Sequence, residues 1–242
     1  MTGFNMDFFM NDLDEIGLQL SDKQINSYFT YYETLIEWNQ YMNLTAITDL
    51  QEVFKIHFID SLTLVKAINL EDGISLIDIG CGAGFPGLAL KIAFPSLKIT
   101  LLDSLNKRIQ FLNVVIDKLG LSEVKTLHGR AEDYARPDKL REQYDLSVSR
   151  AVANLSALSE YCLPYVKPGG KFIAYKSEKL SEEIMDAKGA IELLGGRIEK
   201  TIDFLLPGTD INRSLLVIDK VKKTPGKYPR KAGYPAKEPL KS

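Results

Sequence analysis

The sequence predicts an α/β fold, in which a mostly parallel sheet is covered by helices on both faces. Three observations predict this class. From residue 74 onward, short apolar runs alternate with stretches of helical periodicity. The first run, residues 75–79, ends in a glycine-rich turn that opens a helix. Near the C-terminus, two further apolar runs are joined by residues 207–210, which leave no room for a helix.

Residues 1–70 are predicted to be helical. Ser21 and Gln24 have the spacing of a capping box at the start of the second helix, and the break at residues 43–45 ends it. We expect the apolar stripe of this helix to pack against the next layer of the fold. The stripe consists of Ile25, Tyr28, Phe29, Tyr32, Leu35 and Ile36.

The parallel part of the sheet is expected to alternate strands with helices. The expected strands are residues 74–79, 98–103, 123–128, 144–149 and 171–176. The expected helices are residues 86–94, 105–119, 154–163 and 180–194. Two final strands, Arg197 to Leu206 and Ser214 to Val221, are expected to form an antiparallel hairpin at one edge of the sheet.

Composition and charge limit the class of protein. With 45% hydrophobic and 26% charged residues, the chain is an ordinary globular protein with enough apolar residues for one large core. Its cysteines, Cys81 and Cys162, are far apart and are expected to be reduced. No apolar run approaches the roughly 18 residues of a membrane span, and the N-terminus lacks the basic residues of a signal peptide. We therefore expect a cytoplasmic protein with no membrane contact.

The C-terminal residues have a charge of their own. Residues 220–242 hold eight basic side chains and one acidic one, a net charge of +7, whereas the rest of the chain carries −9. Four prolines and two tyrosines are spaced through the same segment. The composition favours a solvated, disordered terminus. The alternative is an extended tail that offers cations and aromatic rings to RNA.

The glycine-rich turn is compatible with two kinds of ligand. Residues 82–87 fit the dinucleotide-binding pattern G-x-G-x-x-G, and Asp103 lies about 20 residues downstream, where a ribose-binding acid is expected. Residues 78–84 also fit the acidic-x-G-x-G-x-G loop of S-adenosylmethionine-dependent methyltransferases. Asp78 separates the two, because a carboxylate repels a pyrophosphate but attracts the sulfonium and ammonium of S-adenosylmethionine. We therefore favour S-adenosylmethionine as the cofactor.

Three further features favour the methyl donor. About 70 residues precede the first strand, the sheet ends in a hairpin, and residues 163–172 contain a helix end, a Pro-Gly-Gly turn and a strand. The predicted fold is therefore a Rossmann-like class I S-adenosylmethionine methyltransferase sheet with a terminal antiparallel hairpin. We expect a helical segment over residues 1–70, the methyltransferase domain over 71–221 and a basic tail over 222–242.

Longer motifs, taken together, resemble one bacterial family. The chain is similar nearly end to end to the RsmG (GidB) family, which methylates N7 of a guanosine (position 527, in the 530 loop) of 16S ribosomal RNA in the small ribosomal subunit. The most specific motifs are Gly84-Phe-Pro-Gly87 and Ser149-Arg-Ala151. The others are Trp38-Asn39, Asn43-Leu-Thr-Ala46, His57-Phe-Ile-Asp-Ser-Leu62, Leu102 to Arg108, Gly129-Arg-Ala-Glu-Asp133 and Tyr228-Pro-Arg-Lys-Ala-Gly233.

The resemblance implies the positions of the cofactor contacts. Carried over by position, they are Gly80, Phe85, Ala131, Glu132 and Arg150. The loop analysis adds Asp78, Gly82, Gly84 and Asp103 to the predicted cofactor site. Arg150 follows a strand at the crevice where open α/β sheets bind ligands, so it can hold either the donor carboxylate or an RNA phosphate.

Methylation at guanine N7 requires no general base, because N7 presents a lone pair and carries no proton. Holding N7 in line with the methyl group is then sufficient, so we assign no catalytic residue and no metal. The Ser-Arg-Ala sequence at 149–151 replaces the Asn/Asp-Pro-Pro-Tyr loop that serves exocyclic amines. His57 and Asp60 lie one helical turn apart. The resemblance places them on the substrate side, without a chemical role.

The predicted partner is 16S rRNA or the small ribosomal subunit, bound by a monomer. The predicted RNA contacts are Arg150, Lys176, Lys227, Arg230 and Lys231. Removal of residues 222–242 is expected to weaken RNA binding and to leave the affinity for the donor unchanged. Two alternatives stay open: the same fold acting on a small molecule or a protein, and an RNA-binding factor without catalysis.

Overall fold

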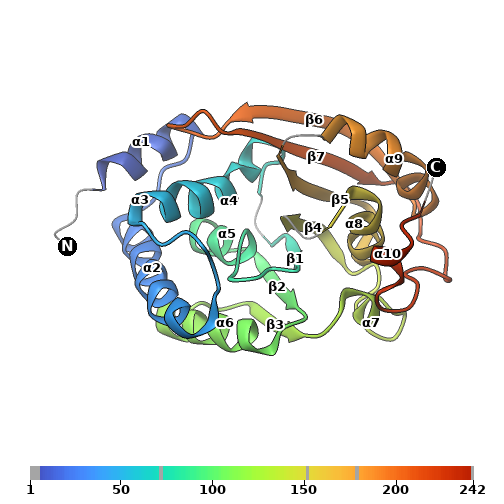
Figure 1. Cartoon of the computed structure of the whole chain (residues 1–242), viewed down its shortest axis with the longest axis horizontal. Coiled ribbons are helices and arrows are strands. Elements are labelled where there is room, and N and C mark those ends of the chain that lie inside the picture. Colours follow the sequence, from blue (N-terminus) through green and yellow to red (C-terminus); the bar gives the residue numbers. More distant parts are fainter. Residues whose placement is uncertain (1–5, 71–72, 151–152, 178–179, 241–242) are drawn as a thin grey trace.

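The computed structural model describes residues 6–70, 73–150, 153–177 and 180–240. In these ranges, one sheet has the strand order β3-β2-β1-β4-β5-β7-β6 (Figure 1). The strands are β1 (Ser75–Ile79), β2 (Lys98–Asp103), β3 (Val124–His128), β4 (Tyr144–Arg150), β5 (Val166–Lys176), β6 (Gly196–Leu205) and β7 (Asn212–Lys220). Strands β1 to β5 pair in parallel, whereas β7 is antiparallel to both β5 and β6. The predicted fold class and its terminal hairpin are confirmed.

Strand β5 begins five residues earlier than the sequence predicted. Tyr144 pairs with Val166, and Leu146 already pairs with Lys171, so residues 167–170 bulge out of the ladder. The Pro-Gly-Gly turn therefore lies inside the strand and not before it. Space requires glycine here, because a Cβ on Gly170 would lie 2.5 Å from the Asp145 carbonyl oxygen.

Most helices lie where the periodicity predicted them. They are α1 (Asp7–Glu15), α2 (Asp22–Met42), α3 (Leu50–Val53), α4 (Asp60–Leu62), α5 (Gly87–Ala93), α6 (Asn106–Leu119), α7 (Ala131–Tyr134), α8 (Leu155–Cys162), α9 (Leu180–Leu193) and α10 (Tyr234–Lys237). A π-helix over Phe54–Ile59 joins α3 to α4, and 3₁₀ turns follow at Thr63–Lys66 and Leu163–Tyr165. The capping box of Ser21 and Gln24 is confirmed at the start of α2. None of the helices in the described ranges is both long and apolar enough to cross a lipid bilayer.

Helices cover both faces of the sheet. Helices α2, α5 and α6 lie on one side, and α7 to α10 lie on the other (Figure 1). The leading helices share the core of the first side, where Tyr28, Phe54 and Phe58 are fully buried. Tyr31 is fully buried as well, although the predicted stripe of α2 omitted it. The N-terminal helices are thus built into the sheet's own core.

The C-terminal residues up to 240 are packed against the domain, so the predicted disordered terminus is wrong for this part of the chain. The Arg141 guanidinium donates hydrogen bonds to the carbonyls of Thr224, Pro225 and Tyr228, at 2.5, 3.2 and 2.7 Å. The Tyr228 side chain is buried. Further on, the Ser156 hydroxyl donates to the Leu240 carbonyl. Composition suggested solvation, but the half-buried Arg141 donates hydrogen bonds to carbonyls that the proline-rich backbone leaves unpaired.

Candidate functional site

Three cavities lie at the carboxyl ends of the parallel strands, the edge where open α/β sheets bind ligands. The strand-end cavity, of about 170 Å³, is lined by Gly80, Asp103, Ala131 and Glu132 among others. The loop cavity, of about 380 Å³, is lined by residues that include Gly80, Gly82, Phe85, Asp103 and Arg150. The arginine cavity, of about 410 Å³, is lined by residues that include Asp60, Arg150, Tyr175, Lys176 and Arg213. Gly80 and Asp103 join the first two cavities, and Arg150 joins the second to the third.

The glycines of the loop divide into two groups. Gly82 has φ +58°, and a Cβ there would meet nothing within 4 Å, because it would point into the open loop cavity. Gly84 has φ +98°, and a Cβ there would lie 2.3 Å from the Tyr31 hydroxyl oxygen. Gly84 lines neither the strand-end nor the loop cavity. It was predicted as a cofactor contact, but its position instead allows α2 to approach the loop.

Asp103, at the end of β2, organises the same loop. Its Oδ2 accepts hydrogen bonds from the Gly82 N–H at 2.9 Å and from the Arg108 guanidinium at 3.2 Å. Its Oδ1 accepts from the Leu105 N–H at 2.9 Å. A carboxylate has room for about four such bonds, so one acceptor position is left for a ligand hydroxyl. Asp103 lines both cavities, in agreement with a ribose-binding role.

Asp78 lies beneath the loop and lines none of the three cavities. Its side chain is fully buried, and its Oδ2 accepts a hydrogen bond from the Gly87 N–H at 2.8 Å. Its Oδ1 has no hydrogen-bond partner among the residues that the structure describes. Burial raises the pKa of this carboxyl to about 7. The prediction that Asp78 attracts a cationic ligand therefore concerns a buried carboxyl beneath the loop and not one at an open surface.

Helix α7, which follows β3, lines the strand-end cavity with Ala131 and Glu132. Glu132 is only 4% exposed, and its Oε1 accepts a hydrogen bond from the Gly233 N–H at 2.8 Å. The Ala131 carbonyl accepts from the Tyr165 hydroxyl at 2.6 Å. Ala131 and Glu132, two of the predicted contacts, thus line the same cavity as Asp103.

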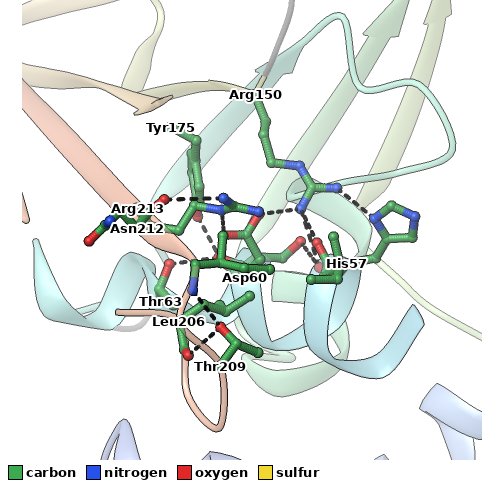
Figure 2. Close-up of polar contacts among 12 residues, drawn as sticks. His57, Asp60, Thr63, Arg150, Tyr175, Leu206, Thr209, Asn212 and Arg213 are labelled. Carbon is green, nitrogen blue, oxygen red and sulfur yellow. Dashed lines mark hydrogen bonds and ion pairs between the residues drawn. The ribbon is translucent and has the colours of Figure 1, made fainter. Parts of the chain in front are cut away.

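Arg150 lines both the loop cavity and the arginine cavity. Its guanidinium donates to the Asp60 Oδ2 at 2.8 Å and to the Ile56 carbonyl at 3.1 Å (Figure 2). It lies 5.2 Å from the centroid of the Phe85 ring, and the His57 ring stacks on Phe85 with centroids 4.7 Å apart. Arg150 and His57 thus line both cavities, and Phe85 packs against them from the loop cavity.

Asp60 connects two arginines. It is almost fully buried, and its Oδ1 accepts a hydrogen bond from Arg213 Nε at 2.9 Å while its Oδ2 accepts from Arg150 (Figure 2). In the same cavity, Lys176 forms an ion pair of 2.6 Å with Glu183. The arginine cavity therefore carries three cations and two carboxylates.

His57 is uncharged at neutral pH. Burial, together with the neighbouring Arg150, lowers its pKa to about 4. Its Nε2 lies 2.8 Å from the Thr45 hydroxyl oxygen. A neutral imidazole at this position adds no further positive charge beside Arg150.

The three tail cations predicted to contact RNA, Lys227, Arg230 and Lys231, do not line the arginine cavity. Arg230 forms an ion pair of 2.8 Å with Glu160, a carboxylate with no exposed surface. Arg230 lines none of the three cavities, so the structure does not bring it together with Arg150 and Lys176. Lys227 and Lys231 are exposed, and neither lines the three cavities.

Sequence analysis missed several residues that shape the site. Tyr31 lies three residues after Tyr28, a spacing that could have placed it on the buried stripe. Arg108 is a cation in the first turn of α6, where the helix dipole disfavours it, and this was a signal for an acidic partner. Arg213 is the second residue of β7, ahead of the apolar residues 215–218, and its ion pair with Asp60 joins positions 153 residues apart. No local sequence pattern predicts a pairing between residues so far apart in the chain.

The sheet order, the glycine-rich loop and the strand-end crevice define the class I methyltransferase fold. Two solved structures agree: a methyltransferase from Pyrococcus furiosus has a TM-score of 0.53 and 19% identity, covering 68% of this chain and 83% of that chain. A SAM dependent methyltransferase from Aquifex aeolicus has a TM-score of 0.51 and 18% identity, covering 70% and 93%.

Residues 24–210 match the model of the family described as rRNA small subunit methyltransferase G, and the chain belongs to this family. Curated relatives named Ribosomal RNA small subunit methyltransferase G support it over nearly the full length. The relative from Lachnoclostridium phytofermentans is 52% identical, covering 96% of both chains. The relative from Clostridium botulinum is 50% identical, covering 98% of this chain and 100% of its own. The predicted family resemblance is confirmed.

Proposed function

We propose that this rRNA methyltransferase uses S-adenosylmethionine to methylate N7 of a guanosine in the 530 loop of 16S rRNA, with the small ribosomal subunit as its partner. The observation that carries the proposal is that Arg150 lines both the loop cavity and the arginine cavity. The loop cavity is large enough for a ligand, and the arginine cavity is lined by charged side chains. Two reactants bound in these cavities can therefore lie next to each other.

The residues present fit the donor. Gly80 and Gly82 leave room for its methionine half, and Asp103 has one acceptor position for a ribose hydroxyl. Ala131 and Glu132 lie where the adenine edge would be recognised. The orphaned Oδ1 of Asp78 is a buried carboxylate oxygen that a nearby cationic ligand would stabilise. When bound, S-adenosylmethionine supplies a methyl group on a positively charged sulfur.

The arginine cavity fits the acceptor. Arg150, Lys176 and Arg213 give it cations for an RNA phosphate or for the O6 atom of guanine. Methylation at N7 puts a positive charge on the base, and the carboxylates of Asp60 and Glu183 lie in the same cavity to stabilise it. No residue has to remove a proton, in agreement with the uncharged, fully hydrogen-bonded state of His57. The task of the protein is to hold N7 in line with the methyl group.

Contact with the rest of the RNA falls to exposed cations. We propose Lys227 and Lys231 for this role, together with Arg150 and Lys176 in the cavity, in a monomer that acts in the cytoplasm. Such contacts neutralise phosphates, so binding should weaken steeply with salt.

The test supplies donor labelled in its methyl group to small ribosomal subunits from bacterial cells that lack this activity. We expect label in 16S rRNA, and none when subunits from cells containing the enzyme are used. Label in ribosomal proteins or in metabolites would overturn the proposal in favour of another acceptor. Donor binding without transfer to any acceptor would favour an RNA-binding factor.

A further inference from the structure

We propose that the C-terminal segment, residues 224–240, is a positioning element of the donor site, which acts by fixing the carboxylate of Glu132. This rests on the proposed function, in which Glu132 recognises the donor. The composition of the segment favoured a disordered terminus, with RNA binding as the alternative. The hydrogen bonds of the segment lead to the strand-end cavity.

The link to the donor site is one hydrogen bond across 101 residues of sequence. The Gly233 N–H donates to Glu132 Oε1 at 2.8 Å. Gly233 has φ +86°, a left-handed conformation that favours glycine. Glu132 lines the strand-end cavity and is almost fully buried, so its orientation decides what the cavity offers to a ligand.

A second contact anchors the segment three residues before Gly233. Arg230 donates to both carboxylate oxygens of Glu160, through its backbone N–H at 2.7 Å, its Nε at 3.1 Å to each oxygen and its terminal nitrogen at 2.8 Å. Glu160 belongs to α8 and has no exposed surface. A buried carboxylate with four such bonds is a strong anchor, because its charge would otherwise have no partner.

Further anchors hold the segment at both ends. The Arg141 guanidinium binds the carbonyls of Thr224, Pro225 and Tyr228, and the Ser156 hydroxyl donates to the Leu240 carbonyl. The segment between them therefore has little freedom, and the Gly233 N–H is held in place for Glu132. Loss of the Arg230 anchor should release this N–H and with it the carboxylate.

The experiment measures donor affinity by titration calorimetry with S-adenosylmethionine alone, in the full chain. We expect Arg230→Met to weaken binding about tenfold, the scale of losing one well-placed hydrogen bond to a charged group. Arg230→Lys should recover part of the loss, because it keeps a cation for Glu160. Lys237→Met removes one charge from an exposed position of the same segment and should leave the affinity unchanged.

Two further variants separate positioning from general damage. Arg230→Met combined with Glu160→Gln removes the anchor without leaving a buried charge unpaired, so that the fold is preserved while donor affinity still falls. In a Glu132→Ala background, Arg230→Met should have no additional effect, because alanine has no side-chain oxygen to accept the Gly233 hydrogen bond.

Unchanged affinity in folded Arg230→Met, or an equal loss in the Glu132→Ala background, would overturn the proposal. Failure of the unaltered enzyme to bind S-adenosylmethionine would instead contradict the proposed function itself. The two failures are thus distinguishable.

Discussion

Tyr31 of helix α2 holds the glycine-rich loop by its Ala83 carbonyl, which accepts a hydrogen bond from the tyrosine hydroxyl. The same ring stacks on Phe85, with centroids 5.5 Å apart and an angle of 20° between the planes. A residue of the N-terminal helices thus supports the loop that lines the loop cavity. These helices are part of the site's framework and not an appendage to it.

Tyr31→Phe should destabilise the protein by about 1–3 kcal/mol, because it leaves the buried Ala83 carbonyl without its partner. Tyr32→Phe is the matched control. Its hydroxyl bonds to the Thr48 carbonyl at 3.1 Å near the surface, where water can replace it, and its loss should cost less than about 0.5 kcal/mol. Urea unfolding measures both. Equal losses would contradict the role assigned to Tyr31.

The two glycines of the loop should differ in their tolerance of a methyl group. Gly84→Ala should cost about 3 kcal/mol or more, because its Cβ would overlap the Tyr31 hydroxyl and its φ of +98° is strained for alanine. Gly82→Ala has open space around the Cβ and should cost about 1–2 kcal/mol for its left-handed backbone alone. Calorimetric unfolding of the two variants compares them. A larger loss for Gly82→Ala would show that the loop packs differently.

Asp78 and His57 should give opposite dependences of stability on pH. Burial raises the Asp78 pKa from 3.8 to about 7, so between these values the folded chain holds a proton that the unfolded chain releases, and stability falls as pH rises. Burial lowers the His57 pKa from 6.5 to about 4, so in that window the unfolded chain holds the proton, and stability rises with pH. The two slopes oppose each other between about pH 4 and 6.5.

Asp78→Asn should therefore steepen the rise of stability with pH, by up to about 1.4 kcal/mol per pH unit. The measurement is the free energy of unfolding in urea at pH 5, 5.5, 6 and 6.5 for both proteins. Parallel curves would mean that Asp78 is already ionised in the folded chain.

The two ion pairs of Asp60 should contribute more to the free energy of unfolding than similar ion pairs at the surface. Asp60→Asn leaves Arg150 and Arg213 without their shared carboxylate in a mostly buried cluster, so we expect a loss of about 3–5 kcal/mol. Asp219 also pairs with two cations, but it is more exposed, and Asp219→Asn should cost less than about 1 kcal/mol. If the two substitutions cost the same, the arginine cavity is more hydrated than its packing implies.

The sequence was sufficient for the fold because its signals are local. Apolar runs, the capping box at Ser21 and the short turn at residues 207–210 each depend on neighbouring residues. The local signals also place Gly82 and Asp103 at the same cavity, because Gly82 lies in the loop after β1 and Asp103 is the last residue of β2. Their role in cofactor binding stays a prediction.

The remaining features depend on contacts between distant residues. The loop pattern assigned Asp78 to the ligand, but in the structure its side chain is buried beneath the loop. There its Oδ2 accepts a hydrogen bond from the Gly87 N–H. The charge of the tail suggested solvent or RNA, but Arg230 has a buried partner in Glu160 that only the folded chain brings to it. Basic composition does not reveal which cation is paired.

The central claim is that the loop cavity binds the methyl donor next to the arginine cavity, so that N7 of a guanine bound in the arginine cavity receives the methyl group. The most direct test is to digest 16S rRNA labelled by this enzyme to nucleosides and to identify the labelled one by chromatography against standards. The account predicts 7-methylguanosine alone. Label in a guanosine methylated on its exocyclic amine, or in any other nucleoside, would contradict it.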